Sequence, residues 1–195
     1  MDVLQPPLIS IVVHKNMKEI IRKIVAAQRQ LDVAITLWFQ GGDTVAIHIL
    51  ACSAYQIIHD INQNKKGRDL LLDTVVIKDE FRRDFISRIK SSYNFFKHAR
   101  NDPDPDGIIE FDSSLTELFL LFSIIGLELN GIKSNPPRNA FTLYLAIHKP
   151  RIMTEKFRKF LAENIPSEDL QNIREIERNH FLEYFSLLWR ELKNR

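Results

Sequence analysis

The residues best suited to chemistry lie between Ser91 and Asp112, in the segment SSYNFFKHARNDPDPDGIIEFD. Asn94, Lys97 and His98 lie in its first half, and the closely spaced Asp102, Asp104 and Asp106 lie in its second half. An imidazole exchanges protons near neutral pH, and an ammonium group stabilises phosphate charge. Carboxylate oxygens bind hard cations. The segment is therefore compatible with acid–base chemistry on a phosphate and with cation binding.

A helix predicted over residues 79–100 positions the first of these groups. At 100° per residue, one face of this helix is apolar and must point to the core. That face carries Phe81, Phe85, Ile89, Ser92 and Phe96. Lys90, Asn94 and His98 follow one another at four-residue steps on roughly the opposite face. We therefore expect His98 at the surface or at a second interface. The alternative is a solvated helix end, where His98 interacts with the helix dipole.

The acidic loop after this helix has the beginning of a calcium-binding pattern. Asp102, Asp104 and Asp106 place oxygens at positions 1, 3 and 5, and Gly107 follows at position 6, as in an EF-hand loop. Position 12 is Ser113, so the bidentate glutamate is missing. We interpret the Asp-Pro repeats as a rigid helix terminator. Weak Ca²⁺ or Mg²⁺ binding by the three aspartates is the alternative, and no other cofactor is expected.

The helix predicted over residues 44–62 carries a stripe of small and titratable side chains, here called the His48 stripe. Its members are Thr44, His48, Ala51, Tyr55, His59 and Asn62. Such a stripe suits contact between helices, including contact across a dimer. His48, Tyr55 and His59 would add a polar cleft if they faced His98. His48 and Cys52, four residues apart with His59 nearby, are a weaker alternative as soft-metal ligands.

A single Glu-x-x-His motif, Glu177 to His180, occurs near the C-terminus. Di-iron bundles need two such motifs and two further glutamates that point inward. The sequence has no second Glu-x-x-His. We therefore expect this motif to be a solvated helix face.

Composition limits the class of protein. A chain of 195 residues supports one well-buried core, and its net charge of +2 does not require a nucleic-acid partner. The single cysteine, Cys52, favours a reducing compartment. The N-terminus lacks the pattern of a signal peptide, and the most apolar run, residues 115–129, is too short to span a bilayer. We expect a cytoplasmic protein with no membrane partner.

Apolar periodicity predicts helices over most of the chain. Their approximate ranges are 16–39, 44–62, 79–100, 113–129, 135–148, 154–164 and 167–192, and residues 8–13 form a short strand or docked arm. Gly41-Gly42 should end the first helix, and Asp43 should cap the second, antiparallel to it. We predict one all-α bundle of about six to seven helices. Residues 1–150 would form its core, with the helices of residues 151–195 docked on it.

The stretch Asn94-Phe-Phe-Lys-His98 resembles the catalytic end of a HEPN-type helix, where an Arg, often followed by Asn, precedes a His by a few residues. HEPN domains are small helical bundles, commonly dimeric. Many are metal-independent ribonucleases in which the Arg and His of both subunits meet in one cleft, and others only bind nucleotides. In this chain Tyr93 occupies the Arg position. Lys97 or Arg100 would only partly replace the bidentate hydrogen bonds that the missing guanidinium makes to phosphate.

A second resemblance is to a family of uncharacterised bacterial helical proteins. It rests on the Gly-Asp turn of residues 37–43, the alanine-rich helix of residues 46–51, and the Asn-Phe-Phe-Lys-His-Ala and Asp-Pro-Asp stretches. The match covers approximately residues 24–112. It implies a family relationship and brings no established activity.

We therefore expect a homodimeric, HEPN-like protein that binds RNA or a nucleotide. Asn94, Lys97 and His98 would form the working surface, with Lys90, Tyr93 and Arg100 beside them. The residues leave open whether the protein is an enzyme; as a metal-independent ribonuclease it would use His98 to move a proton. The rival hypothesis is a non-catalytic interaction or regulatory module that pairs through the His48 stripe.

Overall fold

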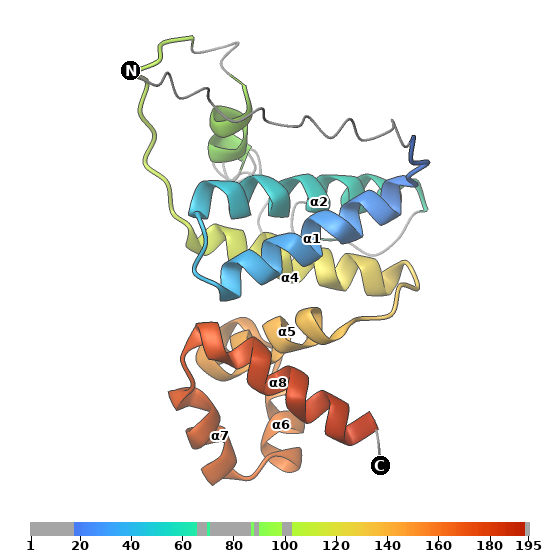
Figure 1. Cartoon of the computed structure of the whole chain (residues 1–195), viewed down its shortest axis with the longest axis vertical. Helices are drawn as coiled ribbons and strands as arrows, with labels where there is room; N and C mark the ends of the chain where they lie inside the picture. Colours follow the sequence, from blue (N-terminus) through green and yellow to red (C-terminus); the bar gives the residue numbers. More distant parts are fainter. Residues whose placement is uncertain (1–17, 66–69, 71–86, 88–89, 99–102, 194–195) are drawn as a thin grey trace, which may run out of the picture.

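The computed structural model describes residues 18–65, 70, 87, 90–98 and 103–193. Within these residues all regular structure is helical, which confirms the predicted all-α bundle (Figure 1). The elements are α1 (Lys23–Phe39), α2 (Thr44–Asn64), α4 (Ser114–Leu129), α5 (Pro136–His148), the 3-10 turn η2 (Pro150–Ile152), α6 (Glu155–Asn164), α7 (Ser167–Glu175) and α8 (Arg178–Lys193). Residues 90–97 are also helical and are called the 90–97 helix. The arm predicted at residues 8–13, Phe81, Phe85, Ile89, Arg100 and Asp102 lie outside the described residues.

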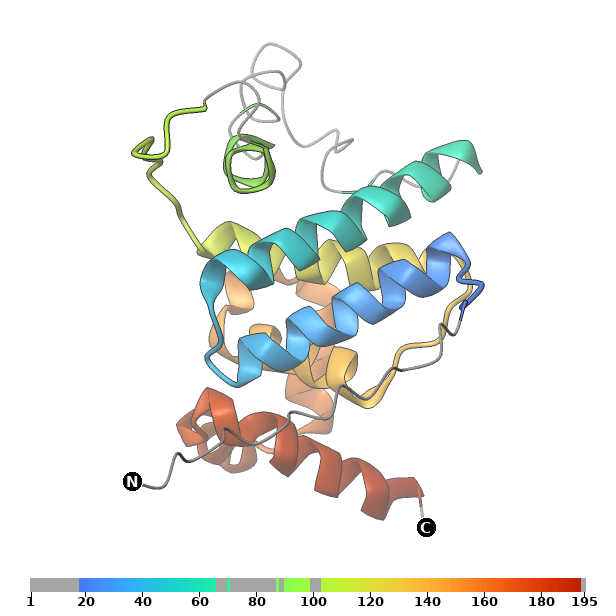
Figure 2. The ribbon, with the colours of Figure 1, turned by 45° about the horizontal axis from the view of Figure 1, so that its top comes forward.

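The turn between α1 and α2 confirms the predicted helix boundary. Gly41 adopts a φ of 68°, a left-handed conformation that suits glycine. The backbone N–H of Gly42 donates to the carbonyl of Leu37 over 2.9 Å. Asp43 caps α2, because its Oδ1 accepts from the backbone N–H of Ala46 at 2.8 Å. The two helices therefore fold back on each other and lie side by side (Figure 2).

Helix α2 packs against α1 and α4. The approach of α4 depends on Gly126, since a Cβ at this position would lie 2.5 Å from Cγ2 of Ile58. Helix α4 also contacts α1 and α5, in line with its predicted place inside the bundle. By length and composition alone, α2 is long and apolar enough to cross a membrane. The same composition is expected of an interior helix, and α2 lies among other helices here.

Helix α5 is attached to α1 by a charged pair. Arg138, which is 3% exposed, donates to both carboxylate oxygens of Asp32, over 2.8 and 2.9 Å. Asn135 donates to the same carboxylate at 3.1 Å, and its own Oδ1 accepts from the backbone N–H of Arg138 and so caps α5. The Asn-Pro-Pro start of this helix was predicted from the sequence, whereas its partner on α1 was not.

The prediction of one long helix over residues 167–192 is wrong. Helix α7 ends at Glu175, Ile176 has extended backbone, and α8 begins at Arg178. Ile176 and Phe181 both pack on the core. Five positions apart on a continuous helix, they would point about 140° away from each other. The break at Ile176 lets both side chains reach the same interior.

The helices of the C-terminal part pack on the rest of the bundle. Helix α8 contacts α5 and α1. Its Phe181 is 1% exposed, with its ring stacked on Phe39 at 6.1 Å and edge-on to Tyr144 at 5.1 Å. Figure 1 shows α6, α7 and α8 together on the side of α5 that faces away from α2. Residues from α8 therefore complete the core that α1 and α5 begin.

Candidate functional site

The 90–97 helix presents the predicted polar face to solvent. Asn94, Lys97 and His98 are exposed, and Lys90 is half-buried. Ser92, on the opposite side, is buried with 5% of its surface exposed. The orientation of this helix, with His98 pointing away from the interior, is therefore as predicted.

Tyr93 is held in place from two sides. Its hydroxyl lies 3.3 Å from the Oγ atom of Ser53 on α2. Lys97 donates to the same hydroxyl at 2.9 Å, and its Nζ lies 5.0 Å from the centre of the Tyr93 ring. An ammonium group thus lies beside the Tyr93 ring and hydroxyl. A single ammonium lacks the bidentate geometry of a guanidinium.

His48 lies inside the protein, with 0% of its surface exposed. Its Nδ1 is 2.9 Å from the Thr116 hydroxyl on α4, and its Nε2 is 3.0 Å from the Ser92 hydroxyl. Nε2 is also 3.5 Å from the sulfur of Cys52. Burial lowers the pKa of His48 to about 4, so the ring is neutral at pH 7. This imidazole therefore joins α2, α4 and the 90–97 helix through hydrogen bonds.

His48 and Tyr55, which were predicted as binding residues, lie inside the helix packing and not at the surface. Both side chains are buried, Tyr55 with 1% of its surface exposed, because α4 and the 90–97 helix cover this part of α2. His59 is half-buried and lies beside Asp60, 3.3 Å from Nδ1 to Oδ1. The His48 stripe is thus largely filled within a single chain. It forms no cleft with His98 among the described residues.

The described part of the chain, which does not include Asp102, holds no group of three His, Cys, Asp or Glu side chains placed to bind an ion. Burial raises the pKa of the Cys52 thiol, which disfavours the thiolate that a metal requires. Asp104 and Asp106 are exposed, and Oδ1 of Asp104 accepts from the backbone N–H of Asp106 at 3.0 Å. This local turn fits the interpretation of the loop as a helix terminator.

The Glu-x-x-His motif is solvated, as predicted. Glu177 and His180 are exposed, and Nδ1 of His180 lies 4.0 Å from Oε2 of Glu177. Arg178, between them, has a different role. Its guanidinium carbon lies 4.8 Å from the centre of the Trp38 ring. A cation over an indole face is a favourable arrangement.

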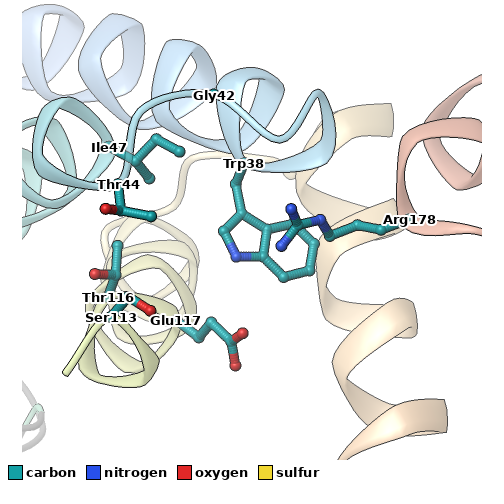
Figure 3. A pocket seen from close by; sticks show the side chains of 8 residues that line it. All are labelled: Trp38, Gly42, Thr44, Ile47, Ser113, Thr116, Glu117 and Arg178. Atoms are coloured by element: carbon teal, nitrogen blue, oxygen red, sulfur yellow. The ribbon is translucent and has the colours of Figure 1, made fainter.

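Trp38 and Arg178 border a cavity of about 70 Å³ that sequence reasoning missed (Figure 3). The wall is formed by the end of α1, the α1–α2 turn and the first turns of α2, α4 and α8. The lining residues are Trp38, Gly42, Thr44, Ile47, Ser113, Thr116, Glu117 and Arg178. Lys149 donates to Oε2 of Glu117. No sequence pattern joins these residues, because they come from separate helix ends.

No family model, curated protein or solved structure matches this chain. The likeness to HEPN-type helices therefore rests on the residues between Asn94 and His98. Of the predicted working surface, the structure brings Tyr93 and Lys97 into contact and leaves Asn94 and His98 beside them in solvent.

Proposed function

We propose that the protein is a cytoplasmic RNA-binding protein that contacts RNA with the exposed face of the 90–97 helix and His98. The observation that carries this proposal is the exposure of Asn94, Lys97 and His98 on one short helix that is anchored from behind. The anchors are the hydrogen bonds between Ser92 and His48 and between Tyr93 and Ser53. A fixed face with ammonium, amide and imidazole groups suits contact with phosphate and ribose oxygens.

Several features favour RNA over a free nucleotide. The polar face is convex helix surface, and the cavity described above lies at a different place, between α2, α4 and α8. Sites for small molecules are concave. Tyr93 and Phe95 are half-buried next to the polar groups, so part of each residue is accessible. Unpaired bases of single-stranded RNA stack on such rings.

Binding is better supported than cleavage. Ribonuclease chemistry needs a phosphate clamp in addition to a proton carrier. His98 can carry a proton, but Tyr93 stands where the clamping guanidinium would be, with Lys97 beside it. A HEPN-like homodimer would bring a second copy of the same face to the RNA. That arrangement is part of the proposal, and its dimer contact would use residues other than the buried His48 and Tyr55.

Fluorescence anisotropy with a labelled single-stranded RNA tests the proposal. We expect His98→Ala and Asn94→Ala each to weaken binding several-fold, because both side chains are exposed and their loss leaves the core intact. The matched control is Lys159→Ala, which removes a cation from α6 that is 75% exposed and lies far from the 90–97 helix (Figure 1). Equal RNA affinity of the wild type and the three variants would contradict the proposed binding surface. Light scattering on the same samples measures the oligomeric state of the protein. Labelled RNA that stays intact after incubation excludes cleavage.

A further inference from the structure

The Trp38 side chain brings a hydrogen-bond donor, its indole N–H, to the wall of the cavity. Trp38 is 7% exposed, and Figure 3 shows its indole nitrogen directed toward the space between α2 and α4. None of the residues that the structure describes accepts a hydrogen bond from this N–H; the contacts of the Trp38 side chain are with rings and with the Arg178 guanidinium. The N–H is therefore open toward the cavity, and a bound molecule with an acceptor at this point would take a hydrogen bond from it.

The wall of the cavity carries both signs of charge. Arg178 lies over the Trp38 ring and brings a guanidinium to one side. Glu117 brings a carboxylate whose side chain is 14% exposed and which Lys149 contacts through Oε2. A simple anion would meet the Glu117 carboxylate, and a simple cation would meet Arg178. A molecule with both a carboxylate and an ammonium group complements both residues.

The cavity is small and polar. Its volume of about 70 Å³ has room for roughly five water-sized groups. Thr44, Ser113 and Thr116 add hydroxyls to its wall. The Thr116 hydroxyl is already in contact with Nδ1 of His48, which fixes its position. A ligand of about five non-hydrogen atoms, with further hydrogen-bonding groups, matches this space.

We propose that this cavity binds a small α-amino acid as its zwitterion. The carboxylate would accept from the Arg178 guanidinium and from the Trp38 indole N–H. The ammonium would donate to Glu117 and to the neighbouring hydroxyls. The proposal is independent of RNA binding, because none of its residues lies on the 90–97 helix.

Indole N–H signals in a ¹⁵N-correlated NMR spectrum provide the test. The chain has two tryptophans, so a Trp189→Phe variant assigns both signals. Trp189 is on α8, stacked with Phe185, and does not line the cavity. On titration with glycine or L-alanine, we expect the Trp38 signal to move and saturate while the Trp189 signal stays in place. A Trp38 signal that does not move with either amino acid would overturn the proposal.

Small ions that carry only one of the two charged groups, together with variants of Glu117 and Arg178, distinguish a zwitterion site from a simple ion site. Acetate and methylammonium should each bind at least tenfold more weakly than glycine. Glu117→Gln and Arg178→Lys should each weaken glycine binding at least tenfold, with an unchanged Trp189 signal as the control for folding. If one of these variants does not fold, the other variant and the affinities of acetate and methylammonium still test whether the cavity binds a zwitterion. Acetate binding as tight as that of glycine, or full glycine affinity in a folded Glu117→Gln protein, would contradict the proposal.

Discussion

The Nδ1 atom of His48 lies 2.9 Å from the Thr116 hydroxyl, across the contact between α2 and α4. On its other side, Nε2 reaches Ser92 of the 90–97 helix. One neutral imidazole thereby sets the position of the helix that carries Asn94, Lys97 and His98. In this account the histidine inside the protein is structural, and the histidine at the surface belongs to the binding face.

The buried His48 should make stability depend on pH. Its pKa is about 4 in the folded protein and about 6.5 in the unfolded chain, which therefore takes up the proton more readily. Stability should be full above pH 6.5 and should decrease as the pH falls from 6.5 to 4. Over this range the free energy of unfolding should fall by about 3 kcal/mol. Urea unfolding at pH 7.5, 6, 5 and 4.5 measures it.

His48→Gln is the control for this prediction. Glutamine keeps hydrogen-bonding capacity but does not titrate in this range. The variant should be less stable at pH 7.5, and the part of the pH dependence that comes from His48 should disappear. An unchanged slope between pH 6.5 and 4.5 would assign the effect to other groups.

Gly126→Ala should destabilise the protein even though alanine favours a helix. A Cβ at this position would lie 2.5 Å from Cγ2 of Ile58 and 3.1 Å from Cδ1 of Leu70. Overpacking costs about 1–3 kcal/mol, whereas the gain in helix propensity is at most about 1 kcal/mol. Chemical denaturation should therefore show a net loss, together with a lower melting temperature.

Ser123→Ala is a matched substitution on the same helix, with the opposite expectation. Ser123 is 0% exposed, and its hydroxyl has no hydrogen-bond partner in the part of the chain that the structure describes. Removing an unpaired buried hydroxyl and adding a better helix former should stabilise the protein by about 0.5–1 kcal/mol. Denaturation curves measured side by side with Gly126→Ala should shift in opposite directions. Equal destabilisation by both changes would contradict the described packing of α4.

The ion pair between Asp32 and Arg138 should show strong coupling. Asp32→Ala leaves the Arg138 guanidinium buried without its carboxylate. The expected loss is about 2–3 kcal/mol, reduced from that of a fully buried pair because the Asp32 side chain is 34% exposed. The double variant Asp32→Ala/Arg138→Met should recover part of this loss. A double-mutant cycle measures the coupling, and purely additive effects would contradict a buried charge pair.

Local sequence signals predicted much of the fold. Asp43 before α2, Asn135-Pro-Pro before α5 and the Gly41 turn each place a helix boundary through short-range hydrogen bonds or backbone conformation. The break at Ile176 was not predicted, because it depends on contacts of α7 and α8 with residues far away in the sequence. The hydrophobic pattern on each side of the break is helical.

The candidate site could be predicted only in part. The exposed face of the 90–97 helix follows from the four-residue spacing of Lys90, Asn94 and His98. The buried position of His48 does not follow from its own helix, since α2 is covered on more than one side and polar residues there have partners on α4 and the 90–97 helix. The cavity at Trp38 brings together ends of helices separated by up to 140 residues, as between Trp38 and Arg178.

The salt dependence of RNA affinity, measured for the wild type and Lys97→Met, tests the central claim most directly. Each phosphate contact of a single strand contributes about 0.7 to the slope of log K against log salt concentration. We predict that Lys97→Met binds more weakly at low salt and has a slope smaller by about 0.7, with Lys159→Ala unchanged. An identical slope and affinity for the wild type and Lys97→Met would contradict an RNA-binding face on this helix.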